Sequence, residues 1–80
     1  MTFGEKAVGL GFNPEGNEKV HKIKNKFADT IDVLNDERER IQSNEEDDGH
    51  KGERLRMLSV AITELQTAQM WAVKAVTWMS

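Results

Sequence analysis

The C-terminal third of the chain restricts the fold more than any other feature. From about residue 53 to residue 79 there is no glycine or proline, and apolar residues recur at the spacing of a helix. On a helical wheel, one apolar stripe consists of Leu58, Ala61, Ile62, Leu65, Ala68, Ala72, Val76 and Met79. A second stripe on nearly the opposite side consists of Met57, Val60, Trp71, Ala75 and Trp78. A short partner helix covers only one of these stripes.

The second stripe predicts that the chain associates with copies of itself. It contains two tryptophans seven residues apart, and a soluble monomer rarely exposes such a patch. Symmetric self-association is the ordinary way to bury it. A chain of 80 residues also forms only one small domain with much exposed surface. We therefore expect a homo-oligomer.

The middle of the chain predicts the partner helix. Asn13, Pro14 and Glu15 form a typical helix start, with a capping asparagine, a proline at the first helical position and an acid in the first turn. The apolar residues that follow form a single stripe, which consists of Val20, Ile23, Phe27, Ile31 and Leu34. One stripe indicates one main packing partner.

Together these patterns predict an all-α fold, a helical hairpin with an extended N-terminal arm, assembled into a homo-oligomer. Residues 1–13 contain three glycines and no helical period, so we expect them to form the arm. The helices are expected at residues 14–35 and 53–79, within a single domain. We expect residues 36–52 to form a solvated acidic connector, although the segment DERERIQ in the first half of this range is also compatible with a longer first helix.

The charge pattern argues against a protein that coats DNA or RNA. The net charge is −3 and the isoelectric point about 5.3, whereas binding the phosphate backbone requires a dominant basic field. The charges are segregated, with four lysines and no acid in residues 19–26 and seven acids in residues 36–48. A small anionic ligand could be held locally while polymeric nucleic acid is repelled.

The pattern does not predict a membrane protein or an enzyme. No stretch reaches the roughly 18 consecutive apolar residues of a membrane span, and the absence of cysteine fits a reducing cytoplasm. His21 and His50 are isolated, and the acids near residue 45 are consecutive rather than spaced along one helical face. We expect a soluble intracellular protein without catalysis, cofactor or metal.

Lys24 and Phe12 are the candidate ligand contacts. On the wheel Lys24 lies between Val20 and Phe27 at the margin of the buried stripe, where a lysine either extends its ammonium to solvent or meets an anion. Phe12 lies in the arm directly before the expected cap, and either packs on the helix start or stays available. An aromatic ring near a lysine suits a nucleotide, because the base stacks on the ring and the phosphate meets the ammonium.

A polar face lies between the two apolar stripes of the second helix. It contains Arg56, Thr63 and Lys74. In an oligomer such a face either lines a cavity between subunits or remains exposed to solvent.

Residue patterns on both helices match those of a known family. On the second helix these residues are Arg56, Ala61, Thr63 and Met70, and Lys74 followed by Ala75. On the first they are Gly11, Phe12, Asn13, Pro14 and Glu15, and Ile23 followed by Lys24. The patterns resemble the phage hairpin-domain proteins that sequester cyclic nucleotides, the anti-CBASS sponges and their anti-Thoeris relatives. The resemblance spans most of the chain outside the connector.

The resemblance implies a compact helical protein, typically a hexamer, that binds cyclic dinucleotides such as 3′,3′-cyclic GMP-AMP between subunits without hydrolysing them. Such a sponge acts in the host cytoplasm and blocks CBASS signalling by removing the second messenger. Matched position by position, Phe12 would stack on a base, Lys24 would contact a phosphate and Asn13 would make a polar contact. Gly11 and Lys26 complete the predicted ligand-binding set.

The resemblance also implies a second pocket. Some relatives bind cyclic trinucleotides there, and Arg56 and Thr63 would contribute to it. The chain departs from the family at Phe12, where many relatives have tyrosine, so stacking is kept but a phenolic hydrogen bond is lost. It also has the apolar Ile62 where relatives often have arginine, which puts the second pocket in doubt.

Another class of function stays open from the sequence alone. The chain could be an oligomeric helical-hairpin module that binds a protein through its acidic connector or its tryptophans, with no small-molecule ligand. Replacing Phe12 or Lys24 by alanine would leave the function of such a module unchanged.

Overall fold

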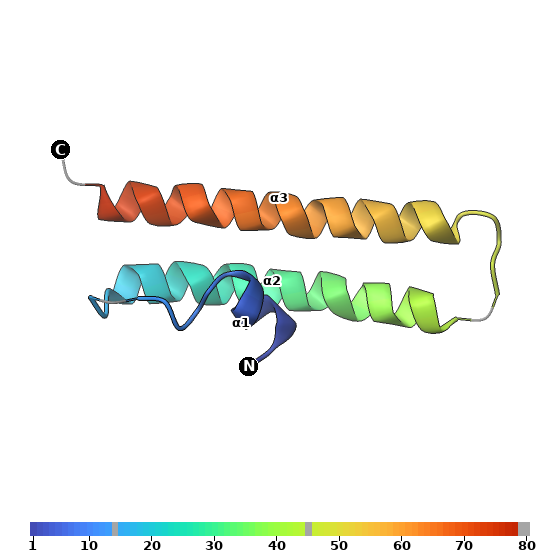
Figure 1. Ribbon diagram of the computed structural model, residues 1–80, viewed down its shortest axis with the longest axis horizontal. Coiled ribbons are helices and arrows are strands. Elements are labelled where there is room, and N and C mark those ends of the chain that lie inside the picture. The colour runs from blue at the N-terminus through green and yellow to red at the C-terminus, as the bar shows by residue number, and fades with distance from the viewer. Residues whose placement is uncertain (14, 45, 79–80) are drawn as a thin grey trace.

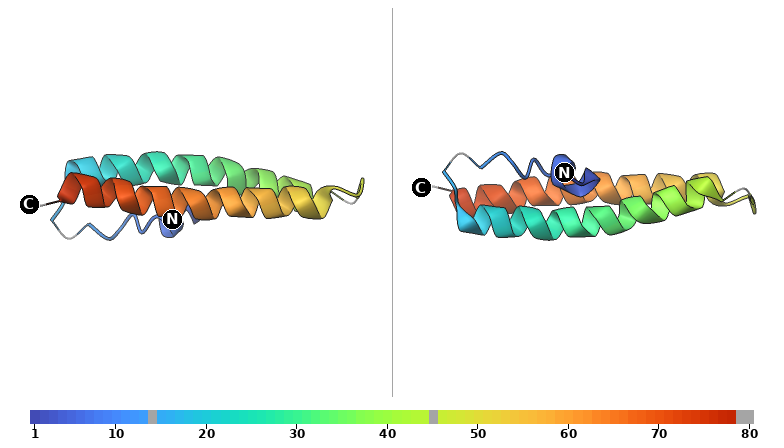
Figure 2. Two further views of the ribbon diagram at one scale, coloured as in Figure 1. Left: turned by 90° about the horizontal axis from the view of Figure 1, so that it is seen from above. Right: turned by 90° about the horizontal axis from the view of Figure 1, so that it is seen from below.

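The chain folds into three helices in the computed structural model, which describes residues 1–13, 15–44 and 46–78. These are α1 (Phe3–Ala7), α2 (Glu18–Ser43) and α3 (Lys51–Thr77), and the described residues contain no strand. Figure 1 shows α2 and α3 antiparallel and side by side, with α1 against α2. The molecule measures 51 × 24 × 13 Å, because two long helices form a single layer beside which only the N-terminal segment packs (Figure 2). The predicted all-α hairpin is confirmed.

The start of α2 lies later than predicted. The helix begins at Glu18, and the Asn17 side chain caps it by accepting hydrogen bonds from two backbone N–H groups of the first turn, at 2.9 and 3.1 Å. The Asn13 side chain instead closes a loop onto Asn17, donating to its carbonyl oxygen at 2.8 Å and accepting from its N–H at 3.1 Å. The predicted start at residue 14 is wrong because Asn17 is a second capping residue, nearer to the apolar stripe. Pro14 itself lies outside the described residues.

Helix α2 also continues beyond the predicted end at residue 35. It runs to Ser43. The extension is stabilised on one side by the burial of Ile41 and on the other by the ion pair between Arg40 and Glu37. The charged run that predicted a connector is therefore mostly the solvent face of a helix.

The connector is shorter than predicted, at residues 44–50 rather than 36–52. Its turn is fixed by the Asp48 carboxylate, which accepts a hydrogen bond from the His50 N–H at 3.0 Å and pairs with Arg54. The backbone hydrogen bond from His50, followed by the Arg54 side chain, lowers the pKa of Asp48. Helix α3 then begins two residues before the predicted start and ends at Thr77, whereas the predicted end at Met79 lies outside the described residues.

The N-terminal arm is not extended as predicted, because it contains α1. Thr2 and Glu5 form a capping box: the Glu5 N–H donates to the Thr2 hydroxyl at 3.0 Å, and the Thr2 N–H donates to the Glu5 carboxylate at 2.8 Å. Five helical residues are too few to show a period in the sequence. The capping box was the signal that could have revealed them.

The hydrophobic core joins the N-terminal segment to both long helices. Its buried members are Val8, Ala28, Ile31 and Ile62, and the partly buried residues around them are Ala7, Leu10, Phe27, Leu34 and Leu65. Val8 follows α1 directly and is 5% exposed. The arm is therefore fixed to the hairpin by hydrophobic burial.

The buried face of α3 is rotated from the predicted stripe. Ile62 is buried as predicted, but Ala68 and Val76 are exposed, and Gln69 is buried instead. The helical wheel missed this rotation because the N-terminal segment also contacts α3. The Gln66 side-chain amide donates a hydrogen bond to the Ala7 carbonyl oxygen at 3.3 Å.

The second predicted stripe of α3 is solvent-exposed in the single chain. All five of its members, Met57, Val60, Trp71, Ala75 and Trp78, are exposed. The prediction that the partner helix cannot cover this stripe is confirmed. None of the helices in the described part of the chain has the length and apolar character to cross a bilayer.

Helix α1 approaches α2 closely at Gly4. The Gly4 N–H donates to the Asp32 carboxylate at 2.7 Å. A Cβ atom on Gly4 would lie 2.1 Å from the carbonyl oxygen of Ala28, far inside contact distance. Only glycine therefore lets the N-terminal segment reach its place on α2.

We expect Gly4→Ala to push α1 off α2 and to lower the free energy of unfolding by about 1–3 kcal/mol, the usual cost of overpacking. Urea unfolding followed by circular dichroism measures this. Gly52→Ala is the matched control, because Gly52 lies in α3 with nothing within 4 Å of an added Cβ. Alanine there should raise stability by up to about 1 kcal/mol. Equal stability of Gly4→Ala and the wild type would contradict the close packing.

Candidate functional site

Lys24 is a buried cation held by the N-terminal arm. Its residue is 5% exposed, and its ammonium donates to the carbonyl oxygens of Gly9 at 2.9 Å and Phe12 at 2.6 Å. Gly9 has a left-handed φ of 63°, and the Phe12 N–H donates to the Gly9 carbonyl oxygen at 2.9 Å, so a tight turn brings both oxygens to the lysine. The ammonium thus meets backbone oxygens, rather than the solvent or the anion considered from the sequence. One of its three N–H groups remains for a ligand.

The Phe12 ring lies beside this ammonium and is open to solvent. The residue is 75% exposed, and the ring centroid is 5.7 Å from the Lys24 Nζ. The ring does not pack on the start of α2 as a hydrophobic staple would. Its surface is therefore available for stacking, next to a positive charge.

These two side chains lie in one hollow of about 300 Å³, here called the Phe12 pocket. The pocket is lined by Phe12, Asn13, Glu15, Asn17, Val20, Lys24, Val73 and Thr77. The arm, the start of α2 and the end of α3 all contribute, because antiparallel pairing places the last turns of α3 beside the first turns of α2 (Figure 1). The pocket offers an aromatic ring, two valines, amide groups, a threonine hydroxyl, one cation (Lys24) and one carboxylate (Glu15). Its volume lies at the small end of the range for ligand pockets, about 300–1,000 Å³.

Sequence reasoning found three of the residues in the Phe12 pocket and missed the rest. Phe12, Asn13 and Lys24 were predicted, and the structure brings them together. Val73 and Thr77 were missed because their place depends on how far each helix extends. Glu15 and Asn17 were missed because the first helix was expected to begin at residue 14, whereas both residues precede α2.

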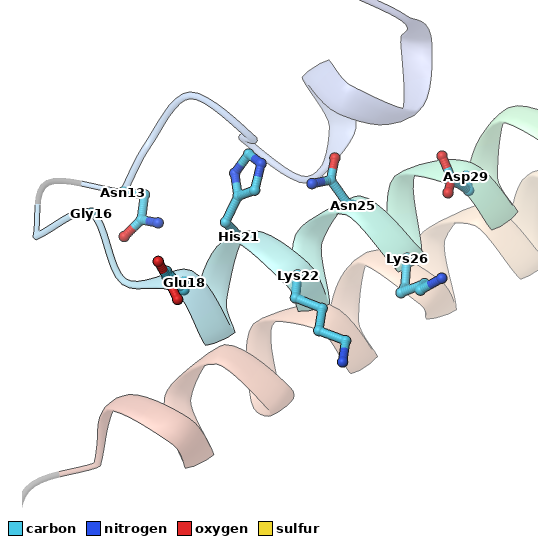
Figure 3. A pocket seen from close by; sticks show the side chains of 8 residues that line it. All are labelled: Asn13, Gly16, Glu18, His21, Lys22, Asn25, Lys26 and Asp29. Atoms are coloured by element: carbon cyan, nitrogen blue, oxygen red, sulfur yellow. The ribbon is translucent and has the colours of Figure 1, made fainter.

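Lys26 lies in a different hollow, of about 470 Å³, on the outer side of α2. This hollow is lined by Asn13, Gly16, Glu18, His21, Lys22, Asn25, Lys26 and Asp29. In Figure 3, Asn13 hangs from the arm near Glu18, whereas Lys22 and Lys26 point away from the arm. Two acids offset the two lysines, so the hollow has no excess of positive charge. Asn13 lines both hollows.

Gly11 lines neither hollow, although it was predicted as a ligand contact. It is exposed, and an added Cβ atom would lie 3.5 Å from the Met1 methyl carbon. Its link to the site is that it precedes Phe12 in the chain.

Arg56 and Thr63 lie apart from the Phe12 pocket, on the exposed face of α3. Arg56 pairs with Glu53, with 2.7 Å between its Nη2 and the carboxylate oxygen. The side-chain hydrogen bond between them lowers the pKa of Glu53. The Thr63 carbonyl oxygen accepts from the Thr67 hydroxyl at 3.2 Å. A second pocket at these residues remains a prediction that concerns an assembly of chains.

Among residues 1–13, 15–44 and 46–78, no three His, Asp or Glu side chains are grouped as metal ligands would be.

Comparison with known proteins identifies one family. The family model for the Acb2/Tad1 hairpin domain matches residues 5–77. This span contains α2, α3 and every residue that lines the Phe12 pocket. No curated protein and no solved structure matches the chain.

Replacing Lys24 by methionine tests whether the lysine holds the arm. We expect Lys24→Met to lower the free energy of unfolding by about 2–3 kcal/mol, because two hydrogen bonds from a charged donor are lost. Backbone amides of residues 10–12 should also exchange their hydrogens faster, as measured by mass spectrometry.

Lys26→Met is the matched control, because Lys26 is exposed on the same helix. Its effect on stability should stay within about 0.5 kcal/mol. Arm amides that exchange at the same rate in both variants would mean that Lys24 does not hold the arm.

Proposed function

Since the chain belongs to the Acb2/Tad1 hairpin-domain family, we propose that it captures cyclic dinucleotides such as 3′,3′-cyclic GMP-AMP without hydrolysing them. The family is that of the anti-CBASS and anti-Thoeris sponges, phage anti-defence proteins that bind their ligands rather than convert them. In this proposal the protein acts in the host cytoplasm and keeps CBASS signalling off by holding the second messenger.

The observation that carries the proposal is the exposed Phe12 ring beside the Lys24 ammonium. A nucleobase stacking on an aromatic side chain contributes about 1–3 kcal/mol. The remaining N–H of Lys24 is then available to a phosphate oxygen, in a charge-assisted hydrogen bond. The Asn13 amide, which lines the same pocket, is placed for a polar contact with a base or ribose.

The ligand has more groups to satisfy than one Phe12 pocket offers. A cyclic dinucleotide carries two bases and two phosphates, whereas one chain supplies one ring and one lysine in a hollow of about 300 Å³. The ligand's near two-fold symmetry suits an isologous interface, in which a second chain supplies the same residues. We therefore propose that two chains complete each binding site.

The second apolar stripe of α3 (Met57, Val60, Trp71, Ala75 and Trp78), here called the tryptophan stripe, supports the assembly that this site needs. Trp71 and Trp78 are 66% and 68% exposed, and the Lys74 ammonium lies 5.3 and 5.4 Å from their ring centroids. Burial of this stripe between chains would remove a large apolar patch from water. A hexamer is the proposed assembly, within which Arg56 and Thr63 would face a cavity able to hold a cyclic trinucleotide.

Titration of the protein with 3′,3′-cyclic GMP-AMP in a calorimeter tests the ligand. We expect saturable binding, and recovery of intact ligand after the complex is heated. Phe12→Leu should weaken binding by roughly 5- to 150-fold through loss of stacking, with stability unchanged because the ring is exposed. A wild-type protein that binds no cyclic dinucleotide would refute the proposal, as would conversion of the ligand.

The assembly is tested by the mass of the protein in solution. We expect an oligomer for the wild type, measured by sedimentation, and a smaller species when Trp71→Gln and Trp78→Gln are combined. Met70→Gln is the control, because Met70 is 67% exposed but lies outside the tryptophan stripe. If all three proteins are monomers, the tryptophan stripe is not an interface.

A further inference from the structure

Arg38 differs from the other arginines in having no acidic partner among residues 1–13, 15–44 and 46–78. The chain contains four arginines, and three of them form ion pairs: Arg40 with Glu37, Arg54 with Asp48 and Arg56 with Glu53. Among the described residues, no carboxylate oxygen lies within 4.0 Å of the Arg38 guanidinium. Arg38 is half-buried, whereas the three paired arginines are exposed. A partly buried charge without a counter-charge favours binding of an anion.

The Arg38 guanidinium is held in a fixed position by neutral groups from three helices. Its Nη1 donates to the Ser59 hydroxyl of α3 at 3.1 Å, and its Nη2 donates to the Asn35 side-chain oxygen of α2 at 2.7 Å. The Phe3 ring of α1 lies below it, with 5.3 Å between the ring centroid and the guanidinium carbon. Two of its five N–H groups are thus used and three remain.

This guanidinium borders a hollow of about 530 Å³, here called the Arg38 hollow. The hollow is lined by Phe3, Asn35, Arg38, Glu39, Gln42, Leu55 and Ser59. It shares no residue with the Phe12 pocket. Lys24 and Arg38 are 14 residues apart on α2, which corresponds to about 21 Å along the helix axis.

We propose that the Arg38 hollow is a separate binding site for a small organic anion that carries one negative charge beside a flat ring. The three remaining N–H groups are available to donate charge-assisted hydrogen bonds to an oxyanion. The planar guanidinium, the Phe3 ring, which is 44% exposed, and Leu55 form the surface for the flat ring. The Glu39 carboxylate lines the same hollow and offsets the charge of Arg38, so the anion is held by its direct contact with the guanidinium rather than by an excess of positive charge. A single negative charge is favoured because the Glu39 carboxylate repels a second one.

The negative charge of such an anion could come from a carboxylate or from a phosphodiester, and two probes distinguish these groups. Benzoate carries its charge on a carboxylate, and 3′,5′-cyclic AMP carries it on a phosphodiester. AMP is the charge control, because it has the same base but a doubly charged phosphate near neutral pH. We expect saturable binding of at least one singly charged probe by calorimetry, and at least fivefold weaker binding of AMP than of cyclic AMP if the phosphodiester is the ligand.

Substitutions on one turn of α2 locate the bound probe. Arg38→Gln should weaken binding at least tenfold, whereas Arg40→Gln should leave it unchanged, because Arg40 is exposed and paired with Glu37. Glu39→Gln should strengthen binding, and AMP should gain more than the singly charged probes. The stronger binding expected for Glu39→Gln tests the site even if Arg38→Gln does not fold.

The outcomes also separate this site from the Phe12 pocket. Phe12→Leu should leave the Arg38-dependent binding of the probes unchanged. The proposal is overturned if neither singly charged probe binds at millimolar concentration, or if the bound probe is lost in Phe12→Leu and kept in Arg38→Gln. Neither result would refute the binding of cyclic dinucleotides in the Phe12 pocket.

Discussion

The candidate site depends on the two hydrogen bonds between the Lys24 ammonium and the arm. A lysine that is 5% exposed would be costly if it lacked partners, and the carbonyl oxygens of Gly9 and Phe12 supply them. The same bonds fix the backbone of Phe12 while its ring stays exposed. One interaction therefore stabilises a buried charge and positions an aromatic ring next to it. The rest of the arm is held against α2 by the burial of Val8 in the core and by the close approach of Gly4 to Ala28.

This arrangement suits a protein that captures a ligand rather than one that transforms it. The pocket supplies a ring surface for stacking and a positive charge, and the Lys24 ammonium and the backbone of Phe12 are held in place before a ligand arrives. Preorganised contacts of this kind improve affinity by lowering the entropy lost on binding. In the proposed assembly, a second chain would enlarge the small Phe12 pocket and cover the exposed tryptophans. Self-association would then build the binding site as well as bury Trp71 and Trp78.

The sequence predicted the long-range plan of the fold better than its local boundaries. Helix α3 was predicted well because no glycine or proline interrupts its apolar pattern. The extension of α2 through DERERIQ was left as an alternative to the connector, because that run holds one apolar residue, Ile41, among charges. The short α1 has no period to detect. The partners of Lys24 could not be predicted, since they are backbone carbonyl oxygens brought near by a turn, and no residue type encodes that contact.

A crystal structure of the protein with 3′,3′-cyclic GMP-AMP would test the proposed site directly. We expect a ligand between two chains, with a base stacked on Phe12 of each chain and a phosphate oxygen within hydrogen-bond distance of each Lys24 ammonium. The Lys24 bonds to the arm would remain in place. A ligand bound away from Phe12, or held by one chain alone, would refute this binding mode.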